Sequence, residues 1–262
     1  MKHKLRLAGM YFRFNLSSIL EYRASFFLSA ATMFFNNATF LFFWGVLFDR
    51  MGGSIGGYDF RDLMFIWAAS SAAFGLSNIV FGNLTSINET VVRGELDSYL
   101  LQPRNVLLSL LMSRMSFSAW GDLAYGVVLI CLSGQGFRGI LAFLLAVVTG
   151  GVVLSSTICV LQSSVFFLGD ASFLANMSAN LAINFTIYPE GIFPKAVRFL
   201  LYWLIPAQFI VHVPLRIARG IHAPVWVAAQ LLAAAFFAGF AMWFFHRGLK
   251  KYESGNMLAT RL

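Results

Sequence analysis

Residues 140–168 read ILAFLLAVVTGGVVLSSTICVLQSSVFFL, a stretch without one charged residue. A helix needs about 20 mostly apolar residues to cross the hydrocarbon layer of a membrane, and this stretch is long enough to cross it at a tilt. Only helices and closed barrels satisfy their backbone hydrogen bonds in lipid. The stretch lacks the short alternating segments of a barrel, so it predicts a membrane-spanning helix.

The composition of the whole chain agrees with that stretch. Of its 262 residues, 59% are hydrophobic and 11% are charged, and the mean hydropathy is +0.74. A soluble domain carries about 25% charged residues because its surface faces water. We therefore expect an all-α, polytopic membrane bundle with most of its surface in lipid.

Six apolar stretches predict six transmembrane helices. Their approximate ranges are 24–48, 63–85, 106–132, 140–168, 172–188 and 225–246. Together they form one transmembrane domain, residues 24–262. Residues 1–23 precede it and place apolar side chains such as Phe12 and Leu16 opposite basic ones such as Arg13, as a helix lying in the membrane interface does. A helix packed on a partner protein would have the same pattern.

Residues 189–224 do not fit a simple span. Residues 199–213 are apolar, but they are short and are interrupted by Pro206 and, just after them, Pro214. A short broken helix is typical of a re-entrant or interfacial segment. With six spans both termini face the cytoplasm, and the basic residues near each terminus favour that orientation. Four basic residues disagree with this orientation, because it places them on the external side of the membrane: Lys195, Arg198, Arg216 and Arg219.

The net charge of +8 has the same explanation. The basic residues gather at residues 2–13 and 246–251, where a cytoplasmic location demands them. They form no patch of the kind that nucleic-acid-binding proteins carry. We expect no nucleic-acid partner, and membrane lipids around the spans.

The loop at 87–104 has the pattern of an amphipathic helix. Its charges are mixed, and its apolar residues recur at helical spacing: Val92, Leu96, Tyr99 and Leu100. Such a stripe predicts a helix pressed against another protein, although a plain surface helix is the alternative. Pro103 ends the helix.

Two motifs in this sequence resemble those of a known family. RGELDSYLLQP at 93–103 resembles the G-x-x-D-x-x-L-x-x-P segment of ABC-2-type permeases, and GLKKYES at 248–254 is similar to their closing G-L-K-x-Y-x-S. The first motif is moderately specific and the second alone is weak. The likeness covers essentially the whole chain in length, span count, basic amphipathic start and basic end.

This resemblance implies a function and partners. Such permeases are membrane subunits of bacterial inner-membrane ABC exporters, and they share the interfacial helix, six spans and re-entrant region expected above. They work in pairs, with an identical or homologous second permease, on a dimer of cytoplasmic ABC ATPases. Their loop after the second span is the coupling helix. By position, Glu95, Asp97 and Tyr99 would contact the ATPase, beside Arg93, while Gly94 and Pro103 would shape the helix ends.

The chain has no ATP site of its own. It contains no G-x-x-x-x-G-K-[ST] loop, and a phosphate cradle needs that loop and its lysine together. ATP and Mg therefore belong to the partner ATPase. His and Cys residues show no ligand spacing and enzyme motifs are missing, so we expect no bound cofactor, no metal and no catalytic residues.

Polar residues inside the predicted spans are the candidates for a substrate path. Asn176, Asn180 and Asn184 share one helical face, which faces protein or water because unpaired carboxamides are costly in lipid. Asp122 lies in the third span, where charges are functional or paired, and Asn36 with Asn37 is a weaker case. Interhelical hydrogen bonds at a dimer contact would explain the asparagines equally well.

The expected function is export of a lipid-like or amphiphilic substrate, driven by a separate ATPase. The alternatives are a self-contained membrane enzyme or secondary transporter dependent on Asp122, and a scaffolding membrane protein.

Overall fold

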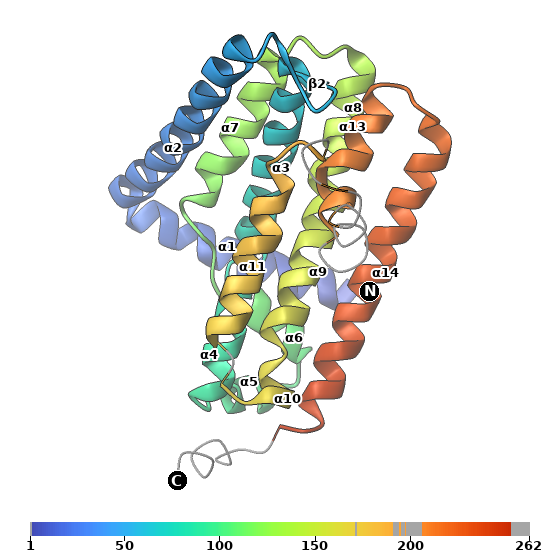
Figure 1. Ribbon diagram of the computed structural model, residues 1–262. Coiled ribbons are helices and arrows are strands. Elements are labelled where there is room, and N and C mark those ends of the chain that lie inside the picture. Colours follow the sequence, from blue (N-terminus) through green and yellow to red (C-terminus); the bar gives the residue numbers. More distant parts are fainter. Residues whose placement is uncertain (1, 171, 191–193, 195–196, 198–205, 253–262) are drawn as a thin grey trace.

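The computed structural model describes residues 2–252 apart from 171, 191–193, 195–196 and 198–205, and it leaves the side chains of 2–6 and 20 undescribed. The described chain is almost entirely helical, and long helices lie side by side from one end of the molecule to the other (Figure 1). Lys195, Arg198, the end of the closing motif and much of the expected re-entrant region lie outside the described residues.

The helices follow the predicted apolar stretches closely. In chain order they are α1 Lys2–Glu21, α2 Arg23–Arg50, α3 Phe60–Val80, η1 Leu84–Ser86, α4 Ile87–Val92, α5 Asp97–Leu100, α6 Val106–Leu111, α7 Ala119–Leu132, α8 Phe137–Leu145, η2 Ala146–Gly150, α9 Gly151–Gln162, α10 Val165–Leu168, α11 Ser172–Thr186, η4 Gln208–His212, α13 Val213–Ala218 and α14 Ala223–Leu249. A small antiparallel hairpin joins α2 to α3 through β1 Ser54–Ile55 and β2 Tyr58–Asp59.

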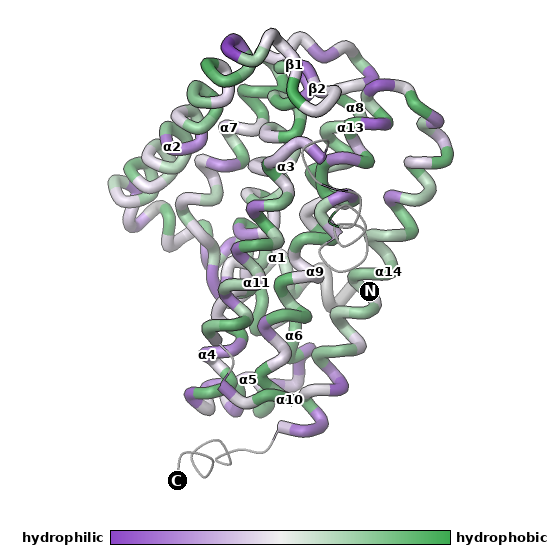
Figure 2. Tube along the Cα trace, viewed as in Figure 1, coloured by the Kyte–Doolittle hydropathy of each residue, from purple (hydrophilic) through white to green (hydrophobic). Residues whose placement is uncertain are grey.

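Among the described residues, four helices are long and apolar enough to cross a membrane: Arg23–Arg50, Phe60–Val80, Phe137–Leu168 and Ala223–Leu249. Figure 2 shows that hydrophilic residues gather mainly at the two ends of the bundle. The protein is therefore a multi-pass membrane protein with an almost all-α fold. The helices α7, with 14 residues, and α11, with 15 residues, are shorter than a full span, so the count of six remains a prediction.

The continuous third span expected at 106–132 is wrong in one respect: the structure breaks it between α6 and α7. Other segments satisfy the backbone groups that the break exposes. The side-chain amide of Asn15 in α1 donates to the carbonyl of Met112 at 3.1 Å. The amide of Asn83 donates to the carbonyl of Leu110 at 3.0 Å, and the backbone of Asn78 accepts from Ser116 at 3.2 Å. Because these partners come from elsewhere in the chain, local hydropathy does not reveal the break.

Helix α1 runs across the bundle rather than along it (Figure 1). It is anchored by Leu7, Asn15 and Ile19, which are buried. Phe12 and Leu16 on the predicted apolar face stay partly exposed. The transverse course fits a helix at a membrane surface, with one edge held by the protein and another left for lipid.

Candidate functional site

Two glycines of α7 bring it close to its neighbours and so position the first candidate site. A Cβ on Gly121 would overlap the carbonyl oxygen of Ala30 in α2, and one on Gly126 would lie 2.6 Å from the carbonyl oxygen of Ala68 in α3. Small residues let helix backbones approach in this way inside membranes. Asp122, next to Gly121, is therefore held where α2, α3 and α7 meet.

Asp122 is bound only by neutral groups among the described residues. The amide of Asn37 donates to its Oδ1 at 2.7 Å, and the hydroxyl of Ser71 donates to its backbone carbonyl at 2.9 Å. Asp122 is 2% exposed, and its Oδ2 has no hydrogen-bond partner among these residues. Charged groups at membrane depth are costly without a partner, which makes this carboxyl a candidate for function.

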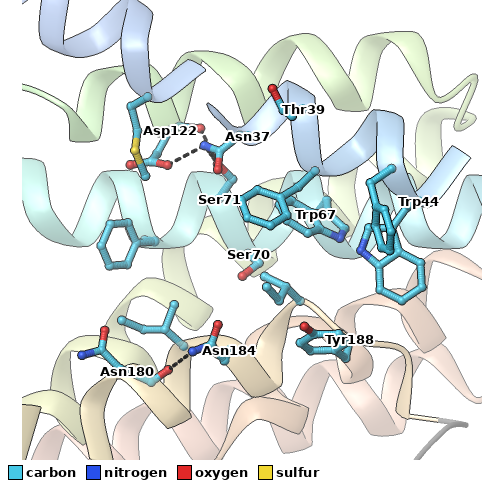
Figure 3. A pocket seen from close by; sticks show the side chains of 16 residues that line it. Asn37, Thr39, Trp44, Trp67, Ser70, Ser71, Asp122, Asn180, Asn184 and Tyr188 are labelled. Atoms are coloured by element: carbon cyan, nitrogen blue, oxygen red, sulfur yellow. Dashed lines mark hydrogen bonds between the residues drawn. The ribbon is translucent and has the colours of Figure 1, made fainter. Parts of the chain in front are cut away.

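Asp122, Asn37 and Ser71 line part of a cavity of about 600 Å³ between α2, α3 and α11. Figure 3 shows Asp122 and Asn37 toward one end of it and Trp44 and Tyr188 toward the other. Its aromatic lining consists of Phe40, Phe43, Trp44, Trp67, Phe74 and Tyr188. Its polar lining consists of Asn37, Thr39, Ser70, Ser71, Asp122, Asn180 and Asn184, and Met33, Ile183 and Ile187 complete it.

The asparagine row of α11 divides between two places. Asn180 and Asn184 line the cavity, and the side-chain nitrogen of each donates at 2.9 Å to the backbone carbonyl one turn earlier. Asn176 lies outside it and accepts a hydrogen bond of 2.8 Å from Gln162. The row therefore faces the cavity over part of its length only.

Of the two adjacent asparagines of α2 considered from the sequence, Asn37 lines the cavity, whereas Asn36, the substrate-path candidate, is exposed and does not. Neighbouring residues in a helix point about 100° apart, and two adjacent asparagines in an apolar run give no sign of which one faces inward. Trp44 and Trp67, also on the cavity, were not singled out either. Their type is common in lipid-facing and packing positions, so nothing in the sequence distinguishes them.

The second candidate site is the loop predicted as a coupling helix at 87–104, which is folded as two short helices instead of one. α4 ends at Val92, and α5 begins at Asp97. Gly94 lies between them with φ of +74°, a left-handed conformation that glycine adopts without steric cost. Arg93, just before this turn, forms an ion pair with Glu89, one helical turn earlier in α4.

The apolar stripe of this loop packs mainly on its own chain. Leu96 is 0% exposed, and Val92 and Tyr99 are partly buried against the core. The sequence pattern suggested that the stripe packs against another protein. Because its own chain covers it, the stripe alone does not require an outside partner. The exposed residues of the loop are Glu89, Arg93, Glu95, Ser98, Leu100, Leu101, Pro103 and Arg104, and Leu101 is 88% exposed.

The two sequence motifs meet in space. The hydroxyl of Tyr252 donates a hydrogen bond of 2.9 Å to Oδ1 of Asp97. Burial, and then the neighbouring Asp97 carboxylate, raises the pKa of Tyr252 to about 12, so its hydroxyl keeps its proton. Gly248 has a packing role, because a Cβ there would lie 2.5 Å from the ring Cδ2 of Phe166. The C-terminal end of α14 is thus attached to α5 and α10.

Ionic contacts hold the opposite end of the bundle. Arg216 donates to Glu190 at 2.7 Å, Tyr58 donates to the same oxygen at 2.9 Å, and Arg219 forms an ion pair with Asp62. Burial opposes ionisation of Glu190, but the hydrogen bond from Arg216 and nearby positive charge keep its pKa below the usual value. Two of the four basic residues that argued against the predicted orientation are therefore paired with carboxylates.

His212 lies behind this cluster and is fully buried in η4, with neither ring nitrogen bonded to a described residue. Its ring is 6.5 Å from that of Tyr58. Burial lowers the pKa of His212 to about 4, with Arg216 acting in the same direction and Glu190 against it. At neutral pH the imidazole is therefore uncharged. A histidine isolated in an apolar run gave no sign of this environment.

Metal binding has no support in the described part of the chain, where no three His, Cys, Asp or Glu side chains come together as a possible ligand group. Cys159 is buried, whereas Cys131 is exposed. The candidate sites are therefore the aromatic cavity with Asp122 and the outward face of the α4–α5 segment.

The structure is a multi-pass helical bundle with a cavity of aromatic and polar lining residues among its helices, a fold that suits a membrane transport protein. The sequence profile of the ABC-2 family of transporter proteins matches residues 34–255. No curated protein and no solved structure matches the chain. The chain belongs to the ABC-2 transporter family and is a membrane permease of an ABC transporter.

Proposed function

We propose that this permease exports a lipid-like or amphiphilic substrate across a bacterial inner membrane, using ATP that a separate cytoplasmic ATPase dimer hydrolyses with Mg. In this proposal both termini and the α4–α5 segment face the cytoplasm. Two permeases, identical or homologous, work together on the ATPase pair. The observation that carries the proposal is the hydrogen bond between Tyr252 and Asp97, which connects an outward-facing turn to the last long helix.

The α4–α5 segment has the properties of a mechanical contact. It lies at the end of the bundle where α14 and α10 also end (Figure 1). Its base is fixed by the buried side chain of Leu96, and its outer surface combines the acidic Glu95 with the apolar Leu100 and Leu101. A force on that surface would reach α14 through Tyr252 and Gly248.

The cavity supplies a place for an amphiphilic substrate. Six of its sixteen lining residues are aromatic, and its carboxyl and carboxamide groups belong to four: Asn37, Asp122, Asn180 and Asn184. Ligand sites commonly combine an apolar wall with a few polar groups that fix orientation. Asn180 and Asn184 are exposed on α11, and carboxamides at membrane depth need protein or water beside them. A second permease, or the substrate itself, would meet that need.

Stimulation of the ATPase by the permease tests the proposal. The ATPase is purified with and without this chain, and its turnover is measured with the wild-type permease, with Glu95→Arg, and with Asp49→Arg as the control. Asp49 is an exposed acidic residue near the C-terminal end of α2, so reversing its charge is the same change as at Glu95, made at a different place. We expect loss of stimulation with Glu95→Arg alone. Glu95 is used without Asp97 because Asp97 also has an internal bond.

Equal stimulation by all three permeases would refute the assignment of the α4–α5 surface. Transport by the purified chain without nucleotide would refute the dependence on ATP and favour a secondary transporter.

A further inference from the structure

We propose that the substrate of the cavity beside Asp122 is an organic cation, with a positively charged nitrogen or phosphorus centre carried on an apolar body. This inference rests on the proposed transport function and adds a chemical class to it. Its basis is the combination of aromatic lining residues with a single carboxyl group that no positive charge accompanies among the described lining residues.

The aromatic wall favours a cation over a neutral apolar molecule. The face of an aromatic ring is negative, and it attracts a cation within about 6 Å, most strongly when water is excluded. Phe40 stacks on Trp67 with ring centroids 5.7 Å apart, and Trp44 meets Tyr188 edge to face at 5.8 Å. These four rings come from α2, α3 and the segment just after α11, and they line the same cavity; aromatic groups also line sites for quaternary ammonium groups.

The charges of the lining favour the same sign. Asp122 is the only ionisable group with a negative form apart from the tyrosine, and none of the described lining residues is Lys, Arg or His. Its neutral partner Asn37 does not offset a negative charge, and Oδ2 has no hydrogen-bond partner in the described part of the chain. A buried carboxylate is costly unless it is paired, so a bound cation stabilises it, whereas an anion would be repelled.

Several hydrogen-bonding groups of the wall can accept from a ligand in the cavity, beside donors such as the indole nitrogen of Trp67, which has no partner among the described residues. Hydroxyl protons of Thr39 and Ser71 are donated to backbone carbonyls. The side-chain nitrogens of Asn180 and Asn184 also donate to the backbone, which leaves their carboxamide oxygens to accept. A protonated amine could donate hydrogen bonds to these oxygens. A fully substituted onium ion has no proton to donate and would interact with the aromatic rings and the charge of Asp122.

A pair of probes with similar shape and opposite charge tests the proposal directly. Saturable binding of radiolabelled tetraphenylphosphonium and of tetraphenylborate is measured on the purified full chain in detergent, with unlabelled excess defining the saturable part. We expect the cation to bind at least about tenfold more tightly than the anion. Saturable binding of the anion at equal or greater strength, or no saturable binding of either ion, would overturn the inference.

Variants locate the binding within the cavity. Asp122→Asn keeps the size of the side chain and removes its charge, and should weaken cation binding at least about tenfold, whereas Asp49→Asn should leave it unchanged. Phe40→Leu removes one aromatic ring and leaves the Asp122 carboxyl in place, and it should weaken cation binding severalfold. Phe42→Leu, at a lipid-exposed position, is its control. Unchanged binding in both Asp122→Asn and Phe40→Leu would contradict the assignment.

These binding measurements need no ATPase, so they separate this inference from the proposed function. Stimulation of the ATPase without cation binding would leave the transport function standing and refute the substrate class. Cation binding without a responsive ATPase would support the site while refuting the motor assignment.

Discussion

The hydroxyl of Tyr252, just beyond the last long helix, donates a hydrogen bond of 2.9 Å to Asp97, the first residue of α5. These residues are 155 positions apart in the sequence, and each belongs to one of the two motifs that suggested the family. Because Leu96, next to Asp97, is buried, the bond connects the base of the outward-facing turn to α14. Movement of the turn should therefore be transmitted to a membrane-spanning helix.

Removing that hydroxyl should reduce coupling more than stability. Tyr252→Phe deletes one hydrogen bond, worth about 1 kcal/mol, and keeps the ring beside Phe166, whose centroid is 6.2 Å away. We expect a fall in thermal stability of a few degrees at most and a several-fold loss of permease-dependent ATPase turnover. Tyr22→Phe, at an exposed tyrosine outside this contact, is the control. An ATPase response equal to that of the wild type would argue against transmission through this bond.

The turn at Gly94 should tolerate few side chains. Its φ of +74° costs an alanine about 1–2 kcal/mol, and asparagine less. We expect Gly94→Ala to lower stimulation of the ATPase and Gly94→Asn to retain more of it. Gly9→Ala, in helix α1 with open space around its Cβ position, should be neutral. Protease sensitivity of the 87–104 segment would measure the disturbance, and equal sensitivity in all three variants would count against the strained turn.

The contact of α2 with α7 at Gly121 should be essential for the cavity. A Cβ there overlaps the backbone of Ala30, so Gly121→Ala must push the helices apart and separate Asn37 from Asp122. Overpacking of this kind costs about 1–3 kcal/mol. We expect a lower thermal midpoint and weakened binding of organic cations. Gly239→Ala in α14, where nothing lies near the added methyl, should leave both unchanged.

Acid should destabilise the protein through His212. Its folded pKa of about 4 lies below the ordinary value of about 6.5, so between these pH values the unfolded chain binds more protons. Stability is therefore present above about pH 6.5 and falls as the pH drops toward 4, by up to about 1.4 kcal/mol per pH unit. His212→Gln should make the thermal midpoint less dependent on pH over this range. A wild-type profile that stays flat from pH 7 to 4.5 would contradict the buried neutral imidazole.

The positions of the helices were predictable from the sequence because lipid imposes a length and a composition on every span. The break between α6 and α7 was not, since it depends on Asn15 and Asn83, which are remote in the sequence. The polar face of α11 was identified correctly as a row, but Asn176 is occupied by Gln162 and only Asn180 and Asn184 reach the cavity. Periodicity shows which residues share a face, and it does not show what that face meets.

The α4–α5 segment illustrates the same limit. The apolar spacing of Val92, Leu96 and Tyr99 correctly predicted amphipathic helical structure, but the chain itself covers much of that stripe. The exposed Leu101 would have been a better pointer to an outside partner, and it stands next to the stripe rather than in it. Gly94 and Gly248 have physical roles, in a left-handed turn and in close packing on Phe166, that emerge only from the backbone geometry.

The side of the membrane on which this segment lies is the most direct test of the account. In a chain with Cys131 and Cys159 replaced by alanine, Leu101→Cys supplies a single exposed thiol. It is treated with a membrane-impermeant maleimide in intact spheroplasts and in inside-out vesicles. We predict labelling in the inside-out vesicles alone, because a cytoplasmic ATPase has to reach this surface. Labelling from the outside of intact spheroplasts would contradict the account.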